Sequence, residues 1–272
     1  MERVNHPAVV AGLSLGMLCL GIWLFRPGPL PPLPAAERHA IAERIYMNEC
    51  GGKAENLVTW SAGEQFPSLG IGHFIWYPAG YHGPFDESFP ALLRFMRAHR
   101  VSLPPWLAKR PGQSAPWPDR HAFEIAAQHD PRISGLRRFL QSTTSVQAAF
   151  MVERMKKALP RILQAAPKLR RSYIRRQFLR LAKAPGGYYP LIDYVNFKGE
   201  GTSPSERYHG KGWGLLQVLG HMAGQGPPRT AFANAAAWVL NRRVRLSPPA
   251  RHEKRWLPGW LKRVRTYVAG PS

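Results

Sequence analysis

Apolar and polar positions in the segment 34–52 follow a helical repeat. The segment holds good helix formers and no internal glycine or proline before its C-terminal end. Ile41, Ile45 and Glu49 are spaced four residues apart, so Glu49 is expected near the line of the apolar stripe. One of the glycines at 51–52 can supply the left-handed residue that closes the helix. The pattern predicts a helix with an acidic residue at its end.

The next segment, 57–77, has the composition of a hairpin or small sheet. It is rich in β-branched and aromatic residues and is interrupted by glycines. Gly70 and Gly72 alternate with apolar residues, so both are expected on one side of a strand. A strand face without side chains lets a ligand approach the backbone closely. A β-bulge without a ligand is the alternative.

The rest of the chain reads as mainly helical, and the predicted class is mainly α with a small β-hairpin or sheet. Helical patterns in the middle of the chain cover 85–98, 123–128, 145–158, 161–165 and 169–183. Pro160 should end or kink the helix in which it lies. Trp106 and Trp117, in a proline-rich loop, either line a saccharide cleft or are buried and fix the loop.

The N-terminal segment predicts export. Residues 7–25 are uncharged and just long enough to cross a bilayer, so 1–26 is expected to be a signal peptide or membrane anchor. A proline-rich tether is expected at 27–35, followed by one domain at 36–270 with a helical insertion at about 85–185. Cys19 falls in the apolar segment, which leaves Cys50 as an unpaired thiol.

The charge balance predicts an anionic partner or environment. The chain has 38 Lys and Arg against 16 Asp and Glu, a formal net charge of +22. Basic residues cluster at 168–180 and 242–265, where a solvated helix face is the common explanation. Nucleic-acid binding is the second interpretation by charge alone, but no known nucleic-acid-binding motif is present. We therefore expect attraction to polyanions of a cell envelope and no nucleic-acid partner.

Glu49 is the candidate for acid–base chemistry. The negative end of the helix dipole disfavours its ionised form, and partial burial acts in the same direction. Both effects favour a carboxyl group that keeps its proton, as a general acid must. A surface glutamate at a frayed helix end is the alternative.

Two blocks of the sequence resemble the phage-type lysozymes. The first is the helix ending in Glu49 followed by S-L-G-I-G-H at 68–73. The second comprises L-I-D-Y-V-N-F-K-G-E-G at 191–201, L-L-Q at 215–217 and the helical pattern of 231–267. The resemblance implies a lysozyme-like fold and cleavage of β-1,4 glycosidic bonds in peptidoglycan, with Glu49 as general acid.

The sequence departs from that family at the second acidic residue. The family has an acidic residue, usually Asp, before the hairpin strand, whereas this chain offers only Glu55 and Glu64 there. If Glu64 reaches the site, it stabilises the transition state or activates water. If it does not, Glu49 serves as both acid and base and a substrate hydroxyl attacks, as in lytic transglycosylases. The resemblance gives His73 a structural role through an ion pair.

Three polar residues of the second block are candidate substrate contacts. Asn196, Glu200 and Gln217 are expected across the cleft from Glu49. Glu200 lies between two glycines, and Gln217 belongs to a Gly-Leu-Leu-Gln element similar to that of lytic transglycosylases. Glu200 paired with Arg207, and Gln217 satisfying buried backbone groups, are the structural alternatives.

The sequence thus predicts a bacterial muramidase, with Glu49 and Glu64 as catalytic residues and substrate contacts at Gly70, Gly72, Asn196, Glu200 and Gln217. We expect no cofactor and no metal, because no zinc-type cluster of ligands is present. Peptidoglycan glycan strands are the expected partner, on the periplasmic side of the inner membrane or outside the cell. A lytic transglycosylase, or a non-catalytic basic protein that binds the envelope, is the alternative.

Overall fold

The computed structural model describes residues 33–83, 85–109 and 112–268. The chain divides into two units, Met1–Pro31 and Pro32–Ser272. The expected signal or anchor at 1–26 lies outside the described residues, as does most of the expected tether. In the described part of the chain, none of the helices combines the length and apolar character that a bilayer crossing requires.

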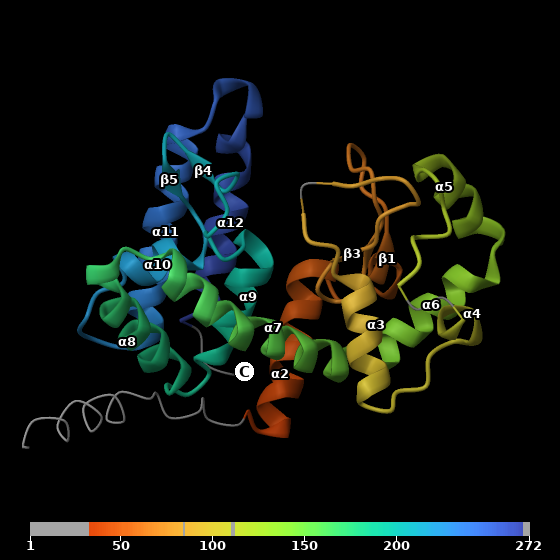
Figure 1. Cartoon of the computed structure of the whole chain (residues 1–272), viewed down its shortest axis with the longest axis horizontal. Coiled ribbons are helices and arrows are strands. Elements are labelled where there is room, and N and C mark those ends of the chain that lie inside the picture. The colour runs from red at the N-terminus through yellow and green to blue at the C-terminus, as the bar shows by residue number, and fades with distance from the viewer. Residues whose placement is uncertain (1–32, 84, 110–111, 269–272) are drawn as a thin grey trace, which may run out of the picture. The chain divides into compact units, whose positions relative to one another are not determined.

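The described residues form 11 α-helices and two small antiparallel sheets, so the mainly α class is confirmed (Figure 1). The α-helices are α2 (Ala35–Cys50), α3 (Phe89–Ala98), α4 (Pro105–Ala108), α5 (Arg120–His129), α6 (Pro131–Ser142), α7 (Thr144–Ala165), α8 (Arg171–Ala182), α9 (Tyr188–Lys198), α10 (Leu215–His221), α11 (Pro228–Leu246) and α12 (Leu257–Arg265). The strands are β1 (Val58–Thr59), β2 (Ser68–Leu69), β3 (Phe74–Ile75), β4 (Arg207–Tyr208) and β5 (Lys211–Gly212). Short 3₁₀ helices include η1 (Ala54–Leu57) and η4 (Glu253–Trp256).

Helix α2 forms where the apolar repeat predicted it. Ile41 and Ile45 are buried, and α2 packs against α7. Gly51 adopts the left-handed conformation at φ 59°, and its N–H donates to the carbonyl of Met47. This termination places Glu49 in the last turn of α2.

The first sheet has the strand order β1-β2-β3, with Val58 opposite Leu69 and Leu69 opposite Phe74. The prediction of one strand across both glycines is wrong, because residues 70–73 form the turn between β2 and β3. Gly70 has φ +69°, and a Cβ there would lie 2.2 Å from Oε1 of Gln147.

Gln147 of α7 holds this turn in place. Its side chain is fully buried, and its Oε1 accepts a hydrogen bond from the N–H of Ile71 at 2.9 Å. Its Nε2 donates to the carbonyl of Leu140 at 2.6 Å. A side chain at Gly72 would meet the ring of Phe74. The glycines therefore let the turn pack closely inside the protein.

Helix α7 contacts two separate groups of helices. It packs against α2 and α3 at one end and against α8, α9 and α10 towards the other, as Figure 1 shows. Of the two outcomes expected at Pro160, an end or a kink, the end is wrong, because α7 continues to Ala165. Pro160 is exposed, so the hydrogen bond that it removes lies on the solvent side of α7.

Helix α6 was not predicted, although its sequence carries the signals of a helix. Asp130 caps it by accepting from the N–H of Arg132 at 2.8 Å, and Pro131 occupies its first turn. Ile133 and Leu136 are fully buried on one face.

The tryptophans of the proline-rich loop pack near Trp76, Trp117 in the core and Trp106 half-buried. The ring centroid of Trp117 lies 6.1 Å from that of Trp76 and 5.2 Å from that of Phe123, and Trp117 is buried. The centroid of Trp106 lies 6.3 Å from that of Trp76. These contacts favour the structural interpretation of both side chains.

The basic segment 168–180 covers a structural helix. Ile174 and Phe178 of α8 are buried. Arg180 donates from Nη1 to the carbonyl of Ala223 at 2.7 Å and also bonds the carbonyl of Gly226. Part of the excess positive charge therefore fixes the loop after α10.

Helix α9 is buried over most of its length and contains one buried charge. Asp193 is fully buried among tyrosine, leucine and isoleucine neighbours on its own helix. Its Oδ2 accepts from Nε of Arg263 at 2.9 Å and from the hydroxyl of Tyr267 at 2.6 Å. Its Oδ1 accepts from Nη2 of Arg263 at 2.8 Å. The pair satisfies the charge and joins α9 to α12.

We predict that Gly70→Ala lowers the free energy of unfolding by about 2–4 kcal/mol, since it adds a Cβ at positive φ against Gln147. Gly135→Ala, inside α6 with open space around it, should be neutral or slightly stabilising. Urea unfolding of both variants measures the difference. Equal stability of the two variants would contradict the packing role of the turn.

We predict that Asp193→Asn destabilises the protein by about 3–5 kcal/mol, because it removes one charge of a buried, hydrogen-bonded pair. Glu124→Gln makes the same chemical change in an exposed pair with Arg120 and should cost under about 0.5 kcal/mol. Thermal and urea unfolding report both. A cost for Asp193→Asn as small as that of the control would show that the pair does not hold α9 to α12.

Candidate functional site

Glu49 lies at the meeting point of three other elements. Its Oε1 accepts a hydrogen bond from Nδ2 of Asn196 in α9 at 3.2 Å and from Nη2 of Arg263 in α12 at 2.5 Å. Its Oε2 lies 3.5 Å from Nδ1 of His73, at the end of the β2–β3 turn. The side chain is 12% exposed. Glu49 is therefore an oriented, nearly buried carboxyl group and not a frayed surface residue.

Arg263 is itself fixed by Asp193. Burial alone would lower the pKa of Arg263, but the negative charges of Asp193 and Glu49 raise it well above its usual value. Burial and the charge of Asp193 likewise raise the pKa of Tyr267, so its hydroxyl keeps the proton that it donates. The guanidinium thus presents a permanent positive charge to Oε1 of Glu49.

The two oxygens of Glu49 have different surroundings. Oε1 receives both hydrogen bonds, from Asn196 and Arg263. Oε2 takes part in no hydrogen bond among the described residues, and it faces His73, whose side chain is 37% exposed. Oε2 is therefore the oxygen from which a proton can pass to a ligand.

Glu64 shares His73 as a neighbour. The Oε2 of Glu64 is buried without a hydrogen-bond partner among the described residues. Burial raises the pKa of Glu64, and the charge of His73 opposes this shift in part. The turn that carries Glu64 is held by Nε1 of Trp60, which donates to the Glu64 carbonyl at 2.9 Å. His73 therefore interacts electrostatically with two carboxyl groups, those of Glu49 and Glu64.

The structure brings Asn196 into direct contact with Glu49 and pairs two further candidates with other parts of the protein, while substrate contact of all three stays a prediction. Glu200 pairs with Arg161 of α7, with Nε to Oε2 at 2.9 Å, so the suggested alternative partner Arg207 is wrong. Nε2 of Gln217 donates to the carbonyl of Gly201 at 3.1 Å, which agrees with the structural alternative.

The glycines around Glu200 serve a backbone contact. The N–H of Leu215 donates to the carbonyl of Gly199 at 3.1 Å, and that of Leu216 donates to the carbonyl of Glu200 at 2.9 Å. A Cβ at Gly214 would lie 2.1 Å from the backbone nitrogen of Gly201. Glycine is needed because the turn after α9 lies directly against the start of α10.

The predicted substrate contact at Gly70 and Gly72 was argued from a strand face without side chains, and the structure has no such strand at these residues. Both residues are buried in a turn, and the space beside them is occupied by Gln147 and Phe74. Packing alone explains why glycine stands at both positions. Contact of either glycine with a ligand stays a prediction.

Cysteine and metal chemistry have no counterpart at this site. Burial, together with the charge of Glu49, raises the pKa of the Cys50 thiol to about 12, so a thiolate nucleophile is disfavoured. Among the described residues, no group of three or more His, Cys, Asp or Glu side chains is arranged to hold a metal ion.

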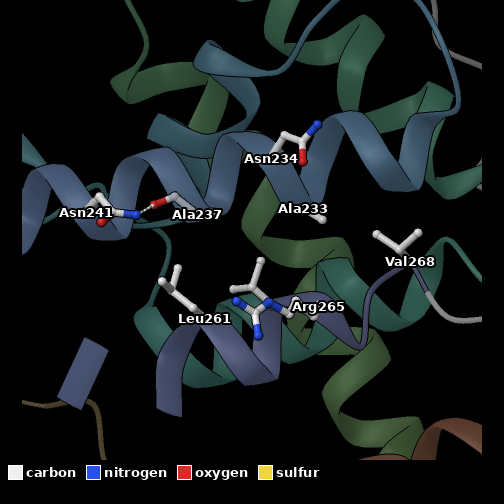
Figure 2. Close-up of a pocket in the computed structure, with 8 residues that line it drawn as sticks. Ala233, Asn234, Ala237, Asn241, Leu261, Arg265 and Val268 are labelled. Carbon is white, nitrogen blue, oxygen red and sulfur yellow. Dashed lines mark hydrogen bonds between the residues drawn. The ribbon is translucent and has the colours of Figure 1, made fainter. Parts of the chain in front are cut away.

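Two grooves elsewhere on the protein have linings that do not include Glu49. One, of about 440 Å³, lies between α11 and α12, and Figure 2 shows Leu261 and Arg265 of α12 beside α11, which contributes Ala237 and Asn241 to the lining. Its lining has one charged group, Arg265, and no carboxyl group. The other, of about 1020 Å³, is lined by α3 and α7 with the start of α2. Neither contains a pair of carboxyl groups that can cleave a glycosidic bond.

Sequence reasoning missed Asp193 and Arg263 as parts of the site. A signal existed for Asp193, because one acid in the otherwise apolar and aromatic run of 188–195 must find a buried partner. Nothing local marked Arg263, which is one of many basic residues in 242–265.

Comparisons of the chain with protein-family models, curated proteins and solved structures found no match. The lysozyme-like resemblance therefore rests on the sequence motifs, and it stays a prediction.

Proposed function

We propose that this protein cleaves β-1,4 glycosidic bonds of peptidoglycan, with Glu49 as the general acid. The observation that carries the proposal is the setting of Glu49. It is a nearly buried carboxyl with Oε1 fixed by Arg263 and Asn196, whereas Oε2 accepts no hydrogen bond among the described residues and lies 3.5 Å from Nδ1 of His73. An orienting network behind one oxygen and a free second oxygen is what proton delivery in a fixed direction requires.

In the proposed reaction the proton moves from Oε2 of Glu49 to the bridging glycosidic oxygen. The bond between that oxygen and the anomeric carbon breaks, and positive charge develops on the sugar ring. Arg263 stabilises the carboxylate that Glu49 becomes, which assists loss of the proton. The step requires Glu49 to carry its proton when the saccharide is bound.

Glu64 is the proposed second carboxyl group. Its electrostatic interaction with His73, the neighbour of Glu49, supports this role. Glu64 in its ionised form would stabilise the positive sugar ring or take a proton from the attacking water. If a hydroxyl of the sugar attacks instead, the product is a 1,6-anhydro sugar and the reaction is that of a lytic transglycosylase.

We predict that Glu49→Gln reduces release of soluble muropeptides from sacculi by at least about 100-fold, because the amide has no proton to donate. Stability should change by less than about 1 kcal/mol, since Gln keeps an acceptor for Arg263 and Arg263 keeps Asp193. Glu55→Gln, the same change at an exposed position nearby, is the control and should keep full activity.

Full activity of Glu49→Gln would refute the assignment. Sacculus binding without soluble products from the native protein would support the non-catalytic envelope-binding alternative. Binding to DNA with steep salt dependence, and no preference for sacculi, would support the nucleic-acid alternative.

We predict that kcat/KM falls as the pH is lowered, with a midpoint above 4.5, because Glu64 must be ionised and its pKa is raised. Glu64→Gln should lose at least about tenfold in kcat/KM and this acid-side fall together. Mass spectrometry of the products distinguishes hydrolysis from 1,6-anhydro formation. A Glu64-dependent fall on the alkaline side would instead make Glu64 the acid and exchange the two roles.

A further inference from the structure

Cations and aromatic rings alternate beside Glu49. The guanidinium carbon of Arg263 lies 4.3 Å from the ring centroid of Phe197. Nζ of Lys198 lies 3.9 Å from the centroid of Phe197 and 3.5 Å from that of Trp260. The guanidinium carbon of Arg243 lies 4.9 Å from the centroid of Trp260. We call these five residues the cation–aromatic stack.

The two arginines of the stack have their charges neutralised by buried acids. Arg263 pairs with Asp193 and Glu49. Arg243 donates from Nε to Oε2 of Glu253 at 2.8 Å and from Nη2 to Oε1 at 2.7 Å, and Glu253 is 4% exposed.

The middle cation differs from both arginines. Lys198 has no ion pair and no hydrogen bond within the described part of the chain; its described contacts are the faces of Phe197 and Trp260. The residue is half-buried. A cation between two rings is attracted by both, but the rings supply no negative charge and no hydrogen-bond acceptor for the ammonium group.

The surroundings of Lys198 disfavour the protonated form of its amine. Burial, followed by the positive charges of Arg243 and Arg263, lowers the pKa of Lys198 to about 6, against the opposing charges of Glu253 and Glu49. At neutral pH the amine is therefore mostly uncharged in the free protein. An anion placed on it would raise this pKa and draw a proton onto the amine.

We propose that Lys198 is the anion-binding position of this site and that it holds a carboxylate of the substrate next to the bond that Glu49 cleaves. The inference rests on the proposed function and deepens it. Peptidoglycan carries carboxylates on its peptide branches, whereas a plain N-acetylglucosamine polymer is neutral. Arg263 bonds Glu49 and faces the same Phe197 ring as Lys198, so the stack links Lys198 to the proposed general acid. The stack thus makes the protein select the anionic, peptide-bearing glycan.

The test is calorimetric binding of soluble peptidoglycan fragments to the Glu49→Gln protein at pH 7.5, in two buffers with different heats of ionisation. Native fragments should bind with uptake of about one proton, because Lys198 passes from mostly neutral to charged. The same fragments with their carboxyls converted to amides should bind about 10- to 100-fold more weakly and take up no proton.

Three further substitutions, each in the Glu49→Gln protein, identify the group responsible. Lys198→Gln should bind native and amidated fragments equally and without proton uptake. Lys198→Arg stays charged at every pH used, so it should keep the preference for native fragments but lose the uptake. Lys262→Gln removes the same charge from an exposed position on α12 and should behave like the parent protein.

A pH series gives a readout that needs no Lys198→Gln protein. Affinity for native fragments should fall more than tenfold between pH 6.5 and 8.5, since protonation of Lys198 becomes more costly. In the Glu49→Gln protein used for binding, the charged groups that remain around Lys198 are Arg243 on α11, Glu253 on η4 and Arg263 on α12. Lys198→Arg should flatten the series and so separates any contribution from His73.

Equal affinity of the Glu49→Gln protein for native and amidated fragments, or proton uptake that persists in the Lys198→Gln variant, would overturn the inference. Cleavage of sacculi by the native protein despite either result would leave the proposed function standing. Preference for native fragments without cleavage of any glycan by the native protein would refute the proposed function and leave anion binding by Lys198 standing.

Discussion

The buried pair of Asp193 and Arg263 is the interaction on which the site depends. It brings a carboxylate with no exposed surface against a guanidinium from a helix that follows much later in the chain. Such a pair gives little net stability when intact, because both charges had to leave water, but it is costly to break. Its main consequence here is geometric. The guanidinium that Asp193 orients is the one that fixes Oε1 of Glu49.

Three helices distant in sequence are thereby tied to one carboxyl group. Helix α2 supplies Glu49, α9 supplies Asp193 and Asn196, and α12 supplies Arg263. Each contact is directional, because hydrogen bonds to charged groups weaken quickly when their angles are lost. The position of Glu49 therefore depends on the packing of α9 and α12 as much as on its own helix.

The sequence was informative wherever a local signal decided the structure. The apolar repeat and the glycine pair set the bounds of α2, and the hydrogen bond from Asn196 to Glu49 agrees with the placement expected from the second block. Predictions from the local sequence failed where contacts with distant parts of the chain decided the structure. Pro160 lies inside a continuous α7 because its lost hydrogen bond faces solvent, and Gly70 is explained by Gln147, 77 positions away in α7. The partner of a buried charge, such as Arg263 for Asp193, has no sequence-local mark at all.

Neutralisation of acids by arginines also explains why the excess of positive charge matters at this site. Glu49 and Asp193 share the guanidinium of Arg263, and Glu253 pairs with both Arg243 and Arg251, so three carboxylates face three guanidiniums and leave little net negative field to repel an anionic polymer. A glycan that carries carboxylates would otherwise be repelled by Glu49, the group that we propose to cleave it. With only 16 acidic residues against 38 basic ones, the rest of the protein adds attraction at long range, which salt screens. Selection between anionic and neutral glycans must then come from short range, and the group that we propose for it is Lys198, the amine of the cation–aromatic stack that has no ion pair in the described part of the chain.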